Sequence, residues 1–322
     1  MTRVGVIVNP LSRHNRDGGF ERAVAAFRDL PHARPGTPAE LLDTLAEFRR
    51  REVRVVAVSG GDGTLREVLT ALPRAYGGEE PDIALLPAGK INLAARVVSR
   101  AGDRFGDGRA GLRRLLDAAR RRTLARVEWP VLDVVWRDAP DRRLRGFLFG
   151  AAAFAAGTRL AYSHVHRAGI NNAAAVALSI AATAASTLFG GRRRALLAGE
   201  DMAVGVDGGP ARGGRRFLAL ATTLDRLVLD LTPFWGEGGG AIRWLDIPAP
   251  PRRLAAALLP VLRGRPRPWM LEAGYASGRA RDLAVEPSRP FVMDGELFEA
   301  GPGGILLSAD RRVGFVEPVG EP

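Results

Sequence analysis

A glycine-rich turn between a strand pattern and a helix pattern constrains this chain most. Val53–Val58 is a β-branched run typical of a buried strand, and Leu65–Leu72 has the composition of a helix. Between them stands the sequence Ser59-Gly60-Gly61-Asp62-Gly63-Thr64. Glycines let the backbone approach a ligand closely, and free N–H groups at a helix N-terminus favour an anion. The stretch therefore predicts a phosphate-binding turn in a strand–turn–helix unit.

The first 128 residues repeat this alternation of strand and helix. The expected strands are Arg3–Val8, Val53–Val58 and Ile83–Leu86, and the expected helices are Gly19–Leu30, Pro38–Arg50, Leu65–Leu72, Asn92–Arg100 and Gly108–Arg122. Such alternation predicts a parallel sheet in a doubly wound α/β layer. Ligands bind at the carboxyl ends of the strands in such folds, which are here the loops beginning at Asn9, Gly60 and Pro87.

The character of the chain changes near residue 129, where strand patterns begin to dominate. These strands are expected at Val131–Trp136, Leu144–Phe149, Met202–Val206, Arg216–Ala221, Arg226–Leu231 and Ala241–Ile247. Helices are expected at Ala173–Phe189 and Pro251–Leu262; the first is short and too polar for a membrane span, which favours a buried or interfacial helix. The chain thus predicts an α/β domain over 1–128 and a β-sandwich-type domain with helical insertions over 129–307.

Composition excludes several classes of chemistry. The chain has no cysteine, so disulfides, thiolate nucleophiles and cysteine-based metal sites are excluded, and its four histidines form no ligand cluster. The net charge of +12 is carried by arginine, because Lys90 is the only lysine. Runs such as Arg120-Arg121-Arg122 are either a solvated face or an attraction to anionic lipid. Lipid is favoured over nucleic acid, because no RNA-binding aromatic motif or zinc-finger spacing is present.

The N-terminal sequence indicates where in the cell the protein is expected. It enters a strand pattern at Arg3 with no secretory signal pattern, so we expect a cytoplasmic protein, with reversible contact to the inner face of the cell membrane left open.

Several candidate site residues have a structural reading beside the functional one. Asp62 is either a turn aspartate or a ligand-facing carboxylate, and Thr64 with Glu67 reads as a helix capping box that leaves other N–H groups for phosphate. Lys90 is a compact charge in a glycine loop, suited to phosphate oxygens. Asp294-Gly295 between Phe291-Val292-Met293 and Glu296-Leu297-Phe298 is a hairpin signal.

Four of these segments together resemble the diacylglycerol kinase catalytic-domain superfamily, which includes bacterial lipid kinases and sphingosine kinases. They are Ile7-Val8-Asn9-Pro10-Leu11-Ser12, Gly60-Gly61-Asp62-Gly63-Thr64 with Glu67, Leu86-Pro87-Ala88-Gly89-Lys90-Ile91-Asn92, and Val292-Met293-Asp294-Gly295-Glu296. The resemblance implies a phosphofructokinase-like nucleotide domain, a lipid-binding β-rich domain, and ATP between the two. It also implies that the segment 308–322 returns to the first domain.

The resemblance also implies roles for individual residues. ATP would be held by Asn9, Ser12, Gly60, Gly61, Asp62, Gly63, Thr64, Glu67, Gly89, Lys90 and Asn92, with Asp62 organising Mg²⁺ as well. The carboxylate of Asp294 or Glu296 would be the general base toward a lipid hydroxyl, and Asp294 is favoured, with Glu296 in support.

Three positions depart from the pattern of that superfamily. Arg13 replaces a glycine, Arg66 replaces an asparagine, and Gly89-Lys90-Ile91-Asn92-Leu93 stands where Gly-Thr-Gly-Asn-Asp is usual. Two alternatives to an ATP-dependent lipid kinase therefore remain: a kinase of a soluble substrate that resembles NAD kinases, and a non-catalytic nucleotide or lipid sensor. The sequence decides neither the acceptor lipid nor whether the chain forms a homodimer.

Overall fold

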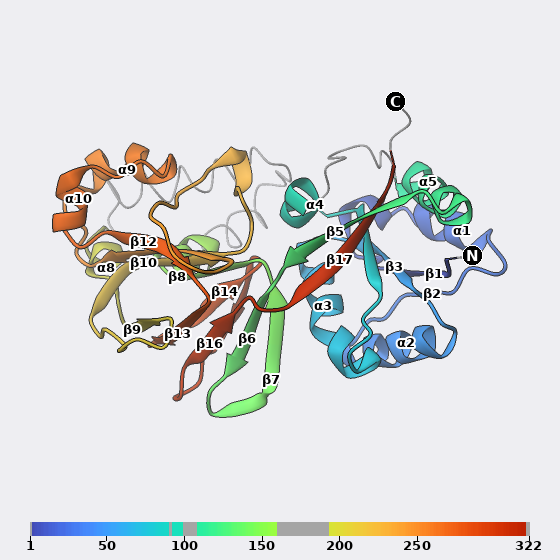
Figure 1. Cartoon of the computed structure of the whole chain (residues 1–322), viewed down its shortest axis with the longest axis horizontal. Helices are drawn as coiled ribbons and strands as arrows, with labels where there is room; N and C mark the ends of the chain where they lie inside the picture. The colour runs from blue at the N-terminus through green and yellow to red at the C-terminus, as the bar shows by residue number, and fades with distance from the viewer. Residues whose placement is uncertain (1, 90–91, 99–107, 160–192, 320–322) are drawn as a thin grey trace. The chain divides into compact units, whose positions relative to one another are not determined.

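The computed structural model describes residues 2–89, 92–98, 108–159 and 193–319. The chain divides into two compact units, one made of residues 1–129 with 312–322 and the other of residues 130–311 (Figure 1). The predicted helix Ala173–Phe189 and the predicted phosphate ligand Lys90 lie outside the described residues.

A six-stranded sheet forms the centre of unit 1. Its order is β2-β1-β3-β4-β17-β5, and the strands are β1 (Val4–Val8), β2 (His32–Ala33), β3 (Val55–Gly60), β4 (Asp82–Pro87), β5 (Leu124–Pro130) and β17 (Arg312–Pro318). β1 pairs in parallel with β2 and β3, and β4 pairs in parallel with β3 and β17. The sequence Val55-Val56-Ala57-Val58 is buried throughout, as expected of a strand covered on both faces.

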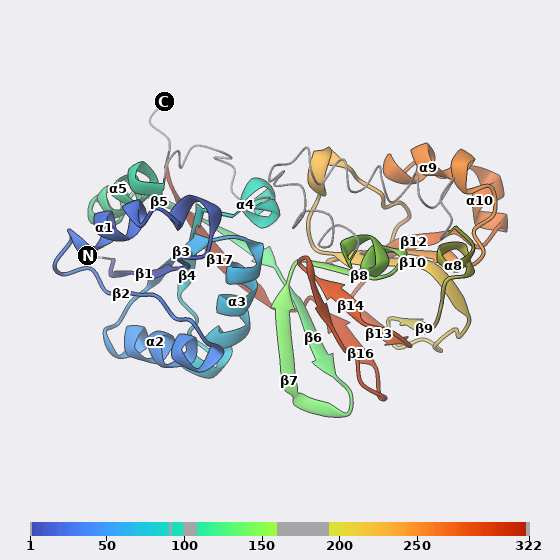
Figure 2. The same ribbon diagram turned by 180° about the vertical axis from the view of Figure 1, so that it is seen from behind.

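Helices cover both faces of this sheet (Figure 2). They are α1 (Gly19–Ala25), α2 (Pro38–Arg50), α3 (Asp62–Tyr76), α4 (Leu93–Val98) and α5 (Gly108–Arg121), with a short 3-10 helix η1 (Arg13–Asn15) before α1. Phe20 and Val24 of α1 pack with Leu112 and Leu115 of α5 in one core cluster on one face. On the other face, α2 buries Leu41 and packs against α3.

Unit 2 is built on an eleven-stranded antiparallel sheet. Its main order is β15-β14-β8-β10-β9-β13-β16-β6-β7, and β11 pairs with both β10 and β12. The strands are β6 (Leu132–Trp136), β7 (Ala139–Gly146), β8 (Leu148–Ala152), β9 (Glu200–Val206), β10 (Arg215–Thr222), β11 (Ile242–Pro248), β12 (Ala276–Ala280), β13 (Asp282–Pro287), β14 (Phe291–Met293), β15 (Glu296–Phe298) and β16 (Ile305–Ser308). Trp136 of β6, Phe149 of β8 and Phe291 of β14 belong to one buried cluster. Because β6 and β14 lie near opposite ends of the strand order, the sheet must curl to bring these side chains together.

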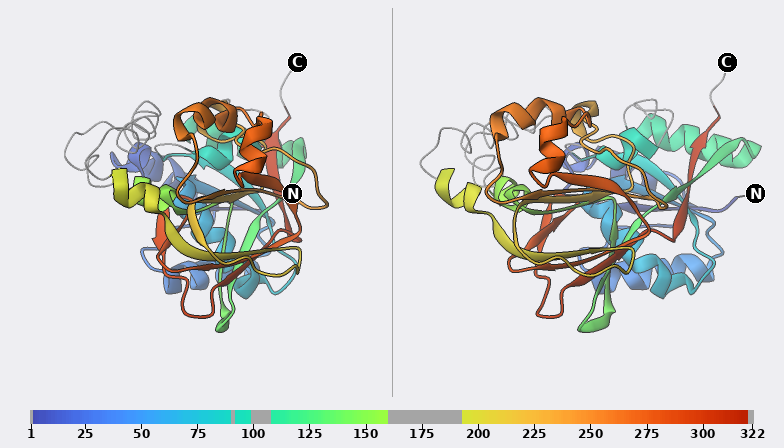
Figure 3. Two further views of the ribbon diagram at one scale, coloured as in Figure 1. Left: turned by 90° about the vertical axis from the view of Figure 1, so that its left-hand side faces the viewer. Right: turned by 60° about the vertical axis from the view of Figure 1, so that its left-hand side comes forward.

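Short helices are inserted between the strands of unit 2. They are α8 (Arg193–Ala198), the 3-10 helix η3 (Val228–Asp230), α9 (Leu254–Leu262) and α10 (Pro268–Glu272). Figure 3 shows α9 and α10 together on one side of β12 and its neighbours. Ala257 and Val261 of α9 and Met270 of α10 belong to a second core cluster, with Leu245 and Ile247 of β11.

The predicted fold class is confirmed: an α/β unit with a parallel sheet and a β-rich unit with helical insertions. Two strand predictions are wrong. Arg226–Leu231 contains η3 instead, because Leu229 and Asp230 adopt positive φ values of 61° and 56°, which break an extended run. Leu144–Phe149 is divided between β7 and β8, with Phe147 between them. Within the described ranges, no helix combines the length and the apolar character that a membrane crossing requires.

Candidate functional site

The three loops that follow β1, β3 and β4 lie together at one edge of the sheet in unit 1. The Asn9 N–H donates to the Ser59 carbonyl at 2.9 Å, which joins the first loop to the end of β3. The Ala88 N–H donates to the Gly60 carbonyl at 2.9 Å, and the His14 N–H donates to the Ala88 carbonyl at 3.1 Å. Backbone hydrogen bonds therefore connect all three loops, as expected for the carboxyl edge of a parallel sheet.

The side chain of Asn9 ties the first loop to the glycine turn. Its Nδ2 donates to Thr64 Oγ1 at 2.7 Å, and its Oδ1 accepts the Leu11 N–H at 2.9 Å. Ser12 lies in the same loop, where its N–H donates to the Asn9 carbonyl at 3.2 Å. The amide of Asn9 thus holds the first loop against the glycine turn.

Asn15 is a site residue that the sequence did not single out. It is only 4% exposed, and its Nδ2 lies 2.9 Å from the Asn9 carbonyl and 3.0 Å from Ser59 Oγ. In return, Ser59 Oγ donates to Asn15 Oδ1 at 3.2 Å. The only available signal was an asparagine in the loop after the first strand, which is a weak signal because such residues are common in turns.

Asp62 links the glycine turn to the N-terminus of α4. Its Oδ2 accepts the Leu93 N–H at 3.1 Å, and its Oδ1 accepts the Ala94 N–H at 3.1 Å. Burial raises the pKa of Asp62, while the N–H groups of Ala94 and Leu93 act in the opposite direction. The carboxylate therefore supplies acceptors to two helix N–H groups that would otherwise be unpaired.

The predicted capping box at Thr64 and Glu67 is wrong. Helix α3 begins at Asp62, with Gly61 as its N-cap at φ −99° and ψ −172°, so Thr64 already lies inside the first turn. Its hydroxyl accepts from Asn9, while Glu67 is exposed beside the buried Arg66, with 3.7 Å between Glu67 Oε1 and Arg66 Nη2. The helix starts three residues earlier than predicted because glycine in an extended conformation occupies the cap position without a side chain.

The first turn of α3 presents backbone donors to the site. Leu65 is the first residue with an intrahelical bond, to Gly61 at 3.1 Å. The N–H groups of Gly63 and Thr64 therefore have no acceptor within the helix. The positive end of the helix dipole adds to their attraction for an anion.

Two of the predicted ligand-binding glycines are needed by the packing of the loops themselves. A Cβ on Gly89 would lie 2.5 Å from the Gly61 Cα, and one on Gly60 would lie 2.5 Å from the Thr64 Cβ. Asn92 stabilises the Gly89 loop, because its side-chain Oδ1 accepts the Gly89 N–H at 3.0 Å. The backbone of Asn92 itself has a φ of 52°. Glycine is thus required at positions 60 and 89 before any ligand is considered.

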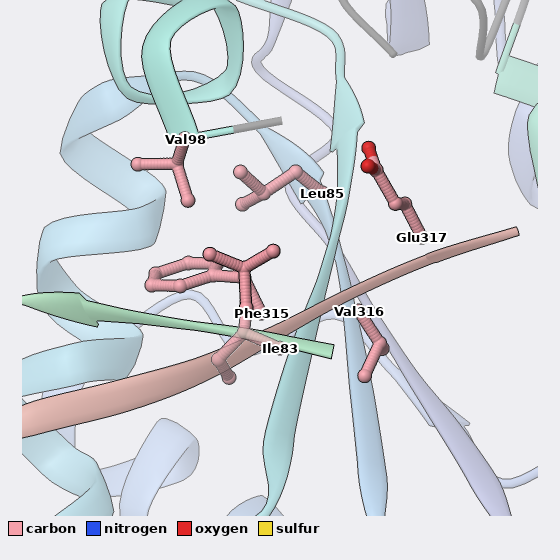
Figure 4. Close-up of a pocket in the computed structure, with 7 residues that line it drawn as sticks. Ile83, Leu85, Val98, Phe315, Val316 and Glu317 are labelled. Carbon is pink, nitrogen blue, oxygen red and sulfur yellow. The ribbon is translucent and has the colours of Figure 1, made fainter. Parts of the chain in front are cut away.

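A small pocket lies beside the glycine turn. Its lining residues are Val58, Gly60, Gly61, Asp62, Leu65, Leu85, Leu86, Pro87, Asn92 and Ala95. Arg13 and Arg16 are exposed on the neighbouring Asn9 loop, where they add positive charge. A second small pocket, between β4 and β17, is mainly apolar: Leu85, Val98 and Phe315 gather in it, and the carboxylate of Glu317 lies apart from them (Figure 4).

The residues around the glycine turn fit Mg²⁺ only if phosphate and water supply most of its ligands. Among the residues that the structure describes, no group of three or more histidine or acidic side chains could hold a metal. Asp62 is the carboxylate at the turn, and its oxygens already accept two N–H bonds. Mg²⁺ is commonly held by one or two carboxylates plus substrate phosphates, so Asp62 alone is compatible with that arrangement.

The predicted hairpin at Asp294-Gly295 in unit 2 is present. β14 pairs with β15 through Phe291–Phe298 and Met293–Glu296, and the two turn residues have φ values of 47° and 88°. Positive φ at both central residues is the signature of a type I′ turn, which asparagine, aspartate and glycine tolerate best.

The turn carboxylate is anchored to the junction of β7 and β8. The Phe147 N–H lies 3.1 Å from both oxygens of Asp294, and the Leu148 N–H donates to Oδ1 at 2.9 Å. Gly146 makes this possible, because a Cβ there would overlap Asp294 Oδ2. Glu296 is exposed at the start of β15. The hairpin therefore carries one fixed carboxylate and one accessible carboxylate.

Comparison with known proteins relates unit 1 to one family. Residues 3–123 match the model of the diacylglycerol kinase catalytic domain. No curated protein sequence matches the chain significantly. The resemblance noted from the sequence motifs is confirmed over that range, which contains the Asn9 loop, the glycine turn and the Gly89 loop.

Solved structures from Bacillus anthracis str. Sterne share the fold. One, described as a "putative diacylglycerol kinase", has a TM-score of 0.62 at 13% identity over 98% of this chain and 96% of that chain. Another, described as a diacylglycerol kinase, has a TM-score of 0.57 at 14% identity over 98% and 96%. A third has a TM-score of 0.59 at 14% identity over 99% of each chain. At this identity, the likeness establishes the fold alone.

Proposed function

We propose that the protein is an ATP-dependent kinase that phosphorylates a hydroxyl group of a diacylglycerol-like or related lipid. The observation that carries this proposal is the arrangement of three loops at the carboxyl edge of the unit 1 sheet, inside the range that matches a diacylglycerol kinase catalytic domain. These loops bring backbone donors, two glycines in contact and a carboxylate to one place.

Phosphate binding rests on the first turn of α3. The N–H groups of Gly63 and Thr64 supply donors directed along the helix axis, and Asn9 holds Thr64 in position. Arg13 and Arg16 add charge at the rim. Phosphoryl transfer needs mainly positioning and neutralisation of charge, which such an arrangement of fixed dipoles and cations favours.

A bound Mg²⁺ would neutralise charge on the phosphates, with Asp62 as its protein ligand. The N–H groups at the start of α4 fix the direction of the Asp62 carboxylate. Lys90, expected in the Gly89 loop, is the further cation of the proposal.

The acceptor hydroxyl would lose its proton to the Asp294-Gly295-Glu296 hairpin. Asp294 is favoured as the general base because three N–H···O contacts from Phe147 and Leu148 hold both oxygens in a defined position, and geometry is the first requirement of such a base. Glu296, which is exposed, supports it by adding negative charge beside the acceptor.

Transfer of labelled phosphate from ATP tests the proposal. The acceptors are diacylglycerol, ceramide, sphingoid bases and phosphatidylglycerol, with NAD in parallel. The proposal predicts label in one lipid class, and label in NADP alone would establish the NAD kinase-like alternative instead.

One observation favours a second candidate, a nucleotide-binding protein without catalysis. Asp62 is occupied by the N-terminus of α4, and the described residues contain no cluster of metal ligands. Tight ATP binding by calorimetry, with no turnover on any lipid or on NAD, would support this candidate.

A further inference from the structure

Helix α9 of unit 2 is apolar around its whole circumference. Its sequence, Leu-Ala-Ala-Ala-Leu-Leu-Pro-Val-Leu over 254–262, contains no polar side chain. A helix of that kind is normally buried on all sides, whereas a surface helix carries a polar face. The residues of α9 are not all buried, so its outer face needs an explanation.

One side of α9 packs on the sheet and the opposite side does not. Ala257 is fully buried and Val261 is 8% exposed, both in the cluster with β11. Leu258 is 36% exposed and Leu259 is 53% exposed. Ala255 precedes these leucines by three and four positions and is also exposed, so they form one apolar stripe along the helix.

The neighbouring helix α10, whose buried side chains share a core cluster with those of α9, carries one further exposed leucine. Leu271 is 56% exposed, although Met270 beside it is fully buried in the same cluster as Val261. We call the exposed side chains of Ala255, Leu258, Leu259 and Leu271 the α9–α10 surface. Ala255, Leu258 and Leu259 lie on one face of α9, and apolar side chains gathered in this way, rather than scattered singly, mark an interaction site.

Positive charge flanks the α9–α10 surface. The chain from Pro251 to Tyr275 contains five arginines and a single acidic residue, Glu272; the arginines are Arg252, Arg253, Arg263, Arg265 and Arg267, and all are exposed. Trp269 lies among them, with the Arg253 guanidinium 5.6 Å from its ring centre. Leucine, tryptophan and arginine together are the composition of elements that lie in the interface of an anionic bilayer.

We propose that the α9–α10 surface docks on an anionic lipid bilayer, with its leucines in the acyl boundary and its arginines on the headgroups. The inference rests on the proposed function, because a lipid kinase has to reach an acceptor held in a membrane. Charge selects the bilayer over a second copy of the chain: a symmetric pair of these surfaces would bring ten arginines together against two glutamates. An anionic bilayer complements them instead.

Vesicle sedimentation tests the docking surface with the full-length protein. Wild type is expected to bind vesicles of phosphatidylcholine with phosphatidylglycerol much more tightly than vesicles of phosphatidylcholine alone, and less tightly as salt is raised. Leu258→Gln/Leu259→Gln should weaken binding by about tenfold or more, because two partly exposed leucines no longer enter the acyl boundary. Leu306→Gln, at a 38% exposed leucine of β16, is the matched control and should bind as wild type does.

A second pair of variants tests the arginines. Arg265→Ala/Arg267→Ala should weaken binding to the anionic vesicles by roughly 25-fold, because each arginine near such a surface contributes about fivefold. Arg281→Ala/Arg311→Ala removes two exposed arginines of unit 2 elsewhere and should change binding little. Unaltered binding by both the leucine and the arginine variants would overturn the proposal. A concentration-dependent dimer that the leucine variant abolishes, with no vesicle binding, would assign the surface to a second copy instead.

Activity on lipid in detergent micelles separates this inference from the proposed function. If both hold, the leucine variant keeps wild-type transfer in micelles and loses it on vesicles. Vesicle binding that depends on the α9–α10 surface, with no transfer under any condition, would support the docking surface and contradict the kinase. Transfer on vesicles that is unaffected by the variants would contradict the docking surface alone.

Discussion

The carboxylate of Asp62 accepts the N–H of Leu93 at 3.1 Å and thereby joins the glycine turn to helix α4, thirty-one residues further along the chain. Its other oxygen accepts the Ala94 N–H. The most conspicuous acidic residue of the sequence is thus part of the scaffold of the site as well as a candidate ligand. Substitution of Asp62 can therefore be tested separately for its effect on the free energy of unfolding and for its effect on nucleotide affinity.

Asp62→Ala should destabilise unit 1 by about 1–2 kcal/mol, because two helix N–H groups lose their acceptor. Hydrogen exchange should accelerate at Leu93 and Ala94 before it does in α2. Asp43→Ala, at an exposed position of α2, serves as the control and should leave the unfolding free energy nearly unchanged. Equal effects of the two substitutions would show that Asp62 does not hold α4.

The bond between Asn9 and Thr64 predicts energetic coupling between two loops. In a double-mutant cycle with Asn9→Ala and Thr64→Val, we expect a coupling free energy of about 1 kcal/mol in urea unfolding, as for a single side-chain hydrogen bond. Both variants should bind ATP more weakly, since the loops are less fixed. Additive effects on stability would contradict a direct bond.

Gly89→Ala should disrupt the site, because the added Cβ would clash with the backbone of the glycine turn. The added Cβ would meet the Gly61 Cα at 2.5 Å, and overpacking of this kind costs roughly 1–3 kcal/mol. Gly36→Ala is the control, because its nearest contact would be an ordinary 3.6 Å to the Glu40 side chain. We expect ATP affinity to fall by an order of magnitude in the first variant only. Normal ATP binding by Gly89→Ala would show that the two loops are not in contact.

Glu200 predicts a pH dependence of stability in unit 2. Its side chain is 8% exposed, and its Oε2 has no hydrogen-bond partner among the residues that the structure describes. Burial raises its pKa, although Arg289 and Arg159 oppose the change. A raised pKa means that the folded state binds the proton more tightly than the unfolded state. Stability is therefore highest below pH 4.5 for this group and falls as pH rises through the folded pKa.

Glu200→Gln should remove that part of the pH dependence and leave unit 2 as stable as wild type at pH 7, or more stable by about 1 kcal/mol. Urea unfolding between pH 4 and pH 8 measures it. If the free energy of unfolding of wild type rose from pH 4 to pH 8 relative to that of Glu200→Gln, the raised pKa of Glu200 would be contradicted.

The sequence predicted correctly those helices and hairpins whose ends are determined by residues adjacent in the chain. The bounds of α2 agree with the prediction because Thr37 caps it, its Oγ1 accepting the Glu40 N–H at 3.2 Å, and Pro38 follows at the first helical position. The hairpin at Asp294-Gly295 was predictable for the same reason, since an Asp-Gly pair between two strand patterns favours the positive φ values of a type I′ turn.

Predictions failed where distant contacts decide the outcome. The start of α3 was missed because Gly61, not Thr64, occupies the cap, and Thr64 is instead engaged by Asn9 across fifty-five residues. Asn15 was missed because its importance depends on Ser59, which only the fold brings near. The strand predicted at Arg226–Leu231 failed for a local reason, because positive φ at Leu229 breaks the extended backbone. Spacing along the chain carries no information on such contacts.

The kinase proposal depends on the fixed carboxylate of Asp294 more than on any other group. The most direct test is single-turnover phosphate transfer to the preferred lipid by wild type and Asp294→Asn, with ATP affinity and thermal unfolding measured on the same samples. We predict that the variant, while still folded, loses at least about 10²-fold in transfer rate and keeps its ATP affinity within about threefold, because a general base acts on the acceptor. A folded Asp294→Asn protein that transfers phosphate at the wild-type rate would contradict the account.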